Sequence, residues 1–148
     1  MNQIPVTENA DAKALELAKR VLRIEAQAVA GLIDRLDAGF PRAVALIRAC
    51  HGRVVVSGVG KSGHIARKIA ATLASTGTPA YFVHAAEAAH GDLGMITRDD
   101  VLIALSNSGE SNEIVCIVPL ITRRGAKLVA MTGNPDSTLA READAHLN

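Results

Sequence analysis

Short apolar runs recur along the chain, and each ends in a turn followed by a segment with helical spacing. The runs cover residues 53–57, 80–83, 101–105 and 127–131. In the segments after them, apolar residues tend to repeat every three or four positions. Strands that alternate with helices predict right-handed crossovers and a parallel sheet covered on both faces. We therefore expect an α/β fold, a doubly wound three-layer α-β-α sandwich around a parallel sheet.

The segments around these runs predict the rest of the architecture. A long amphipathic helix is expected over 11–36, before any strand, and residues 1–10 are expected to form a flexible tail. Further helices are expected at 41–50, 62–75, 111–124 and 137–142, a helical turn at 85–89 and an edge strand near His146. The chain of 148 residues is long enough for one core and too short for two, so 11–148 is expected to be a single domain.

Composition excludes several kinds of partner. Aromatic residues make up 2% of the chain, and 16 Lys and Arg stand against 15 Asp and Glu, so it lacks both a stacking platform and a basic cluster for nucleic acid. Cys50 and Cys116 lie far apart and form no CxxC pair, which favours two reduced thiols. No stretch reaches the ~18 apolar residues of a membrane span and no secretory signal is visible, so we expect a cytoplasmic protein without membrane contact.

Residues 54–64 read VVVSGVGKSGH, with the G-x-G-x-x-G spacing of many dinucleotide sites. An NAD site needs Asp or Glu at the end of the second strand, but that strand, AYFVH, ends in His84. A P-loop fails as well, because Val55 stands where its first glycine is required. A tight strand-to-helix turn with close packing explains the glycines equally well.

The segment SNSGES, Ser106 to Ser111, follows the next long strand of the predicted sheet. Its three hydroxyls and its flexible glycine can surround a phosphate dianion with hydroxyl and backbone N–H donors. One serine would suffice to cap the following helix, so three within six residues favour an anion site. Ser62, on the neighbouring glycine loop, is a further candidate for the same anion.

These segments resemble a known family. GVGKSGHIARKIAATLASTGTPAYFVH, EAAHGDLGMI and ALSNSGESNEI are similar to the sugar isomerase (SIS) domain of the D-arabinose 5-phosphate isomerases, and EAAHGDLG is the most particular piece. The resemblance implies a flavodoxin-like sheet and a phosphosugar-binding domain over 11–148. It implies an aldose–ketose isomerase that interconverts D-ribulose 5-phosphate and D-arabinose 5-phosphate and so supplies the Kdo sugar of Gram-negative lipopolysaccharide.

The resemblance also marks what this chain lacks. Family members continue through the end of the SIS domain into a tandem pair of CBS domains, and nothing of these follows Asn148. Their active site also draws on a further histidine from that stretch, supplied by a neighbouring subunit. We therefore expect a C-terminally truncated fragment, whose own turnover is not assured.

Isomerisation through an enediol needs a base, a group that neutralises the oxyanion and an anchor for the phosphate. The resemblance assigns the substrate contacts to Ser62, Gly77, Thr78, His90, Ser106, Asn107, Ser108, Gly109 and Ser111. Lys61 begins a helix, where a cation opposes the macrodipole by ~0.3–1 kcal/mol, so an active-site role is favoured over a solvated lysine.

Two further residues are candidates for proton transfer. Glu113 falls in the first turn of a helix, where dipole pairing alone would explain it, and the resemblance makes it a candidate general base. His90 is assigned ring opening or hydroxyl proton transfer. Which of Lys61, Glu113 and His90 takes the carbon-bound proton stays open.

No cofactor is expected to be required. The resemblance includes a zinc-contacting histidine at His84, which His90 could join as a ligand. Two histidines without a cysteine do not make a structural zinc site, so zinc there is expected to be inhibitory or adventitious. The apolar stripe of the long first helix predicts packing against another subunit in a dimer or tetramer.

Three alternatives are weighed against this function. An SIS isomerase for another sugar phosphate would share the serine loop but should lack EAAHGDLG. A non-catalytic phosphosugar sensor would keep the serine loop and give no use to Lys61, Glu113 and His90 together. A dinucleotide-binding module is disfavoured by His84.

Overall fold

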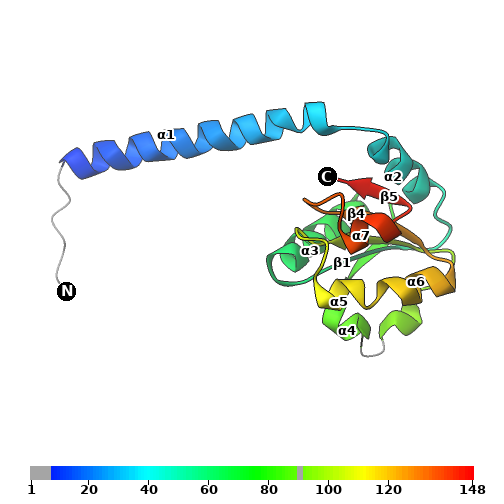
Figure 1. Cartoon of the computed structure of the whole chain (residues 1–148). Coiled ribbons are helices and arrows are strands. Elements are labelled where there is room, and N and C mark those ends of the chain that lie inside the picture. The colour runs from blue at the N-terminus through cyan, green and yellow to red at the C-terminus, as the bar shows by residue number, and fades with distance from the viewer. Residues whose placement is uncertain (1–7, 90–91) are drawn as a thin grey trace, which may run out of the picture. The chain divides into compact units, whose positions relative to one another are not determined.

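The structure, a computed structural model, describes residues 8–89 and 92–148 (Figure 1). The chain divides into two units that meet between Leu36 and Asp37. The first unit contains helix α1 (Glu8–Gly31) and a short 3-10 helix, η1 (Ile33–Arg35). The helix predicted over 11–36 is thus confirmed for most of its length. It ends at Gly31, a residue type that favours helix termination because its backbone is the least restricted.

The second unit is built on a five-stranded sheet in which every pair of neighbours is parallel. Its strands are β1 (Val54–Gly58), β2 (Ala80–His84), β3 (Val101–Leu105), β4 (Lys127–Met131) and β5 (Ala145–Leu147). The order β2-β1-β3-β4-β5 is the flavodoxin-like order, so the predicted fold class is confirmed.

Helices cover both faces of this sheet, so the second unit has three layers with the sheet in the middle. They are α2 (Gly39–Arg48), α3 (Gly60–Ser75), α4 (Ala85–Ala89), α5 (Asn112–Val115), α6 (Val118–Arg124) and α7 (Thr138–Glu142), with a 3-10 turn η2 (Asp92–Met95). One core cluster joins the sheet to α4, α5, α6 and α7, and it includes Ile114 and Leu139. The other cluster joins the opposite face to α2 and α3 through Ala43, Ala66 and Ala70. Small alanines on α3 let this helix approach the sheet closely.

The helix predicted over 111–124 is divided into α5 and α6. Pro119 lies at the start of α6 and has no N–H to donate to the carbonyl of Val115, four residues earlier. The chain therefore turns between the two helices. Gly125 ends α6 in the left-handed conformation, with φ of 78°, as expected for a glycine C-cap.

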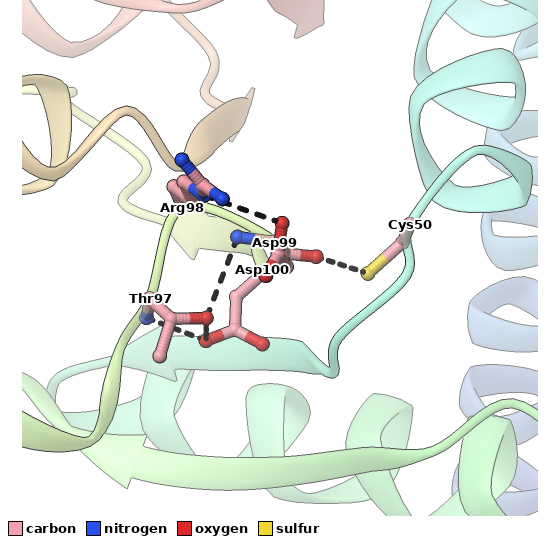
Figure 2. A network of polar contacts seen from close by, with 5 residues as sticks. All are labelled: Cys50, Thr97, Arg98, Asp99 and Asp100. Atoms are coloured by element: carbon pink, nitrogen blue, oxygen red, sulfur yellow. Dashed lines mark hydrogen bonds and ion pairs between the residues drawn. The ribbon is translucent and has the colours of Figure 1, made fainter.

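A polar network fastens the amino ends of β1 and β3 (Figure 2). Asp100 is 5% exposed, and its carboxylate accepts hydrogen bonds from the Arg53 N–H and from the backbone N–H and hydroxyl of Thr97. The preceding carbonyl, of Asp99, accepts from the Gly52 N–H over 2.8 Å and from Cys50 Sγ over 3.3 Å. Because these bonds fix the start of both central strands, the carboxyl ends of the strands are held in register.

Candidate functional site

The direction of chain progression reverses between β1 and β3. From β1 the chain passes to β2 on one side, and from β3 it passes to β4 on the other. In such sheets ligands bind outside the carboxyl ends of the two strands at the reversal. Gly58, the last residue of β1, pairs with Leu105, the last residue of β3, so the glycine loop and the serine loop begin side by side.

The glycines of the first loop serve close packing and a special backbone conformation. A Cβ atom on Gly58 would stand 2.9 Å from the carbonyl carbon of Ser62, and one on Gly63 would stand 3.0 Å from Gly58 O. Gly60 has open space around it but a φ of +53°, which other residues rarely adopt. The G-x-G-x-x-G spacing is therefore explained by a tight turn from β1 into α3, without a dinucleotide.

The first turn of α3 presents donors and a cation at this edge. Val59, the N-cap residue, makes no side-chain capping bond, so the first N–H groups of α3 have no acceptor from that side chain. Lys61 is exposed, and no ion pair to it is found among the described residues. Ser62 is half-buried beside it. The arrangement suits a ligand that carries negative charge.

Hydrogen bonds within the serine loop (residues 106–111) give it a defined shape. Ser106 is 2% exposed, its hydroxyl lies 2.8 Å from that of Ser111, and it accepts from the Gly109 N–H over 3.2 Å. Ser108 is exposed, and its hydroxyl accepts from the Glu110 N–H. Ser106 therefore braces the loop from within, while Ser108 offers its hydroxyl hydrogen to solvent. Asn107 is exposed as well.

Glu113 and His84 lie at the same edge of the sheet. Glu113 is exposed in the first turn of α5. His84 ends β2, pairs with Gly58, and accepts the Ala86 N–H at Nδ1 over 3.3 Å. Because Nδ1 is the acceptor, a neutral His84 ring carries its hydrogen on Nε2 and donates from there. The structure thus brings together Lys61, Ser62, His84, Glu113 and the serine loop around the ends of β1, β2 and β3.

Three predicted residues are not brought to this edge by the described structure. His90 lies outside the described residues. Gly77 and Thr78 follow the far end of α3, where the Pro79 carbonyl accepts from Val54 N–H at the amino end of β1. A helix of 16 residues spans about 24 Å, so within one copy of the chain Gly77 and Thr78 lie at the opposite edge of the sheet.

Two features of this edge were not predicted from the sequence. The loop after β4 lies beside the serine loop, where the Gly133 N–H donates to Asn107 O over 2.9 Å. A usable signal exists, because TGNPDS follows β4 as SNSGES follows β3. The second feature is Ser57, 1% exposed near the end of β1, whose hydroxyl has no hydrogen-bond partner among the described residues.

The described residues do not fit a zinc site. Across 8–89 and 92–148, no three His, Cys, Asp or Glu side chains gather in a way that could hold a metal ion. The Nδ1 atom of His84 is already engaged by the Ala86 N–H. The same part of the chain contains no helix with the length and apolar character needed to cross a membrane.

Comparisons with known proteins place the chain among sugar isomerase domains. A profile of the SIS domain family matches residues 46–148. The Arabinose 5-phosphate isomerase KdsD of Pseudomonas aeruginosa is 57% identical over 131 residues, covering 88% of this chain and 40% of that protein. The protein of the same name from Yersinia pestis is 54% identical over 132 residues, covering 89% of this chain and 40% of its own length.

A solved structure, that of E. coli CFT073 c3406 in complex with A5P, has a TM-score of 0.87 and 44% identity, covering 93% of this chain and 73% of that one. The chain spans about 40% of the length of the curated relatives it matches. Because the family profile covers more than half of its residues and the sheet has the order expected for the fold, the chain belongs to the SIS domain family.

Proposed function

We propose that this chain is the substrate-binding and catalytic domain of an aldose–ketose isomerase that interconverts D-ribulose 5-phosphate and D-arabinose 5-phosphate. The observation that carries the proposal is that the serine loop and the turn with Lys61 begin side by side at the sheet's reversal point, in a chain 57% identical to a protein named Arabinose 5-phosphate isomerase. The product would enter the synthesis of the Kdo sugar of lipopolysaccharide.

The phosphate of the substrate is held between the two loops. The donors are the loop N–H groups and hydroxyls of Ser108 and Ser111, with Ser62 on the facing turn. Ser106, Asn107 and Gly109 give the loop its shape and complete the substrate-binding set. Lys61 supplies positive charge at the start of α3, although a cation at a helix N-terminus is unfavourable to the helix dipole.

The chemical step moves a proton between C1 and C2 through an enediol. Lys61 stabilises the enediolate or the phosphate, and Glu113 is the general base. His90 opens the sugar ring or transfers a hydroxyl proton. The Nε2–H of His84 is a further donor for a substrate oxygen. Gly77 and Thr78 contribute as substrate contacts from another subunit, since in their own copy they lie at the opposite edge.

No cofactor takes part in this scheme. Enediol chemistry needs a base and an oxyanion partner, and the residues above provide both. A zinc ion at His84 would compete with the bond from the Ala86 N–H, so we assign zinc no step and expect it to inhibit.

We propose that the chain assembles into a dimer or tetramer. A single helix cannot bury its own apolar residues, and within the first unit α1 has no sheet to cover Leu15, Leu22 or Val29. A second copy of the chain covers them. Sedimentation should therefore give a mass of at least two chains. A monomer at every protein concentration of a dilution series would contradict this assembly. We place the protein in the cytoplasm, where its sugar phosphate substrates are found.

The test of function is direct conversion. The 148-residue chain, and any longer protein that contains it, is incubated with D-ribulose 5-phosphate, and D-arabinose 5-phosphate is followed by NMR. Product from either form supports the isomerase, and product from the longer form alone shows that a further segment is required. Phosphosugar binding without product in both forms would favour the sensor, and conversion of a different sugar phosphate would favour the related isomerase.

A further inference from the structure

The serine loop is fastened along one side by the segment that follows β4. This segment, residues 132–139, contains the turn after β4 and the first residues of α7. The Gly133 N–H donates to Asn107 O over 2.9 Å, and the Leu139 N–H donates to Gly109 O over 3.1 Å. The Thr138 N–H donates to the Glu110 carboxylate over 2.7 Å.

These three bonds share one polarity. In each, the serine loop provides the acceptor and the segment 132–139 provides the donor. Acceptors repel a phosphate and donors attract it, so this arrangement occupies the groups of the loop that would oppose an anion. Glu110 matters most, because its carboxylate carries a full negative charge two residues from Ser108.

Three backbone donors of the loop remain free. Among the described residues, the backbone N–H groups of Asn107, Ser108 and Ser111 donate to no acceptor. With the carbonyls of Asn107 and Gly109 engaged, these three free N–H groups form a binding surface for an oxyanion. The loop conformation held by residues 132–139 is thus the one in which these N–H groups are free.

The segment that holds the loop is itself rigid. Ser137 is fully buried, its hydroxyl donates to Asn134 O over 2.7 Å, and it accepts from the Ala140 N–H. The Glu110 carboxylate is held ionised in place, since the hydrogen bonds from Thr138 lower its pKa. The partner of Glu110 is therefore fixed before any ligand arrives.

We propose that Glu110 is a positioning residue for the phosphate of the substrate. By accepting the Thr138 N–H it turns its own charge toward α7 and holds the serine loop with the N–H groups of Asn107, Ser108 and Ser111 free. The inference rests on the proposed function, because the phosphate concerned is that of D-arabinose 5-phosphate.

The experiment measures binding of D-arabinose 5-phosphate to the 148-residue chain by titration calorimetry, well below the unfolding temperature. E110A removes the acceptor and should weaken binding about three- to tenfold, the loss that one hydrogen bond brings. E110Q keeps a carbonyl oxygen for the Thr138 N–H and removes the charge, so it should bind within about twofold of the unmodified chain or tighter. A role in stability alone would lower the unfolding temperature of E110A and leave its Kd unchanged.

A backbone variant tests the same bond from the other side. Proline is favoured at the first residue of a helix, the place of Thr138, and Ser137 has φ −72° and ψ 158°, which suit a residue before proline. T138P therefore removes the donor while keeping α7, and it should weaken binding as E110A does. The double variant should lose no more than either single variant.

E142A is the matched control, since it removes an exposed carboxylate from α7 that makes no bond to the serine loop. Its Kd should equal that of the unmodified chain. E110A with unchanged affinity, or E110Q as weak as E110A, would overturn the positioning role and leave the proposed function standing. If the unmodified chain does not bind D-arabinose 5-phosphate, the proposed function fails and the inference fails with it.

Discussion

Gly109 and Ser137 lie so close that a Cβ atom on the glycine would stand 2.1 Å from Ser137 Oγ. Gly109 also has a φ of +68°, in the left-handed region that favours glycine. The two constraints are independent, one set by a buried neighbour and one by the backbone. They make this glycine the point at which the serine loop is seated against α7.

Gly109→Ala should therefore destabilise the protein by about 2–4 kcal/mol, because it combines left-handed strain with overpacking. Gly77→Ala is the control, since Gly77 has a φ of +95° with open space around it and should show the backbone strain alone. Urea denaturation measures both. Equal losses in the two variants would mean that Ser137 moves aside and does not constrain the loop.

Ser57→Ala should stabilise the protein. The Ser57 hydroxyl is buried, has no partner among the described residues, and a group of this kind costs about 1–3 kcal/mol. Removing it should raise the unfolding temperature by about 2–5 °C in thermal denaturation. Ser106→Ala is the contrasting variant and should lower it, because the Ser106 hydroxyl is bonded to Ser111 and Gly109. A fall with Ser57→Ala would reveal a hydrogen-bond partner for this hydroxyl.

The ionised carboxylate of Asp144 should account for part of the loss of stability at acid pH. Burial alone would raise the pKa of Asp144, but hydrogen bonds from the Leu128 N–H and from Lys127 lower it below the ordinary 3.8. A carboxylate with a depressed pKa contributes stability that is present above its unfolded pKa and lost as the pH falls through its folded pKa.

Asp144→Asn should accordingly flatten the dependence of unfolding temperature on pH below about pH 4. At pH 7 the variant should be less stable by about 1–3 °C, since it loses a partly exposed ion pair. Asp136→Asn removes an exposed carboxylate from the loop after β4 and should leave the acid slope as it is. An unchanged slope for Asp144→Asn would place the acid-sensitive group elsewhere.

Lys61→Ala should lower turnover about 100- to 1000-fold, the loss that follows removal of one group stabilising an oxyanion. The unfolding temperature should change little, because Lys61 is exposed and has no ion pair among the described residues. The assay is the conversion of D-ribulose 5-phosphate in whichever form of the protein turns over. Lys68→Ala, an exposed lysine further along α3, serves as the comparison and should retain full activity. A comparable loss of turnover in both variants would mean that Lys61 acts only through the general charge of the surface.

Much of the sheet could be predicted because its central strands are continuous apolar runs. Residues 101–105 and 127–131 were expected as strands and are β3 and β4. Burial on both faces leaves no polar residue inside β3, so its ends coincide with a change in polarity. The break between α5 and α6 was not predicted, although Pro119 carries the signal, because apolar spacing continues across it.

The sequence predicts the parts of the candidate site that lie at the ends of strands, and it predicts less of what depends on neighbouring loops. The serine loop follows directly from the sequence, because a strand end and its hydroxyls are adjacent in the chain. The contact between Glu110 and Thr138 joins residues 28 positions apart and depends on β3 and β4 being neighbours. Sequence spacing contains no such information before the strand order is known.

The two ends of the second unit meet at one corner. A Cβ atom on Gly39, near the start of this unit, would stand 2.1 Å from the carbonyl oxygen of His146 in β5. A short linker from Asn148 back to Asp37 would therefore close the unit into a ring, and new termini could be opened at the exposed turn of Gly125, after α6. The sheet, the glycine loop and the serine loop would keep their connections in this circular permutant.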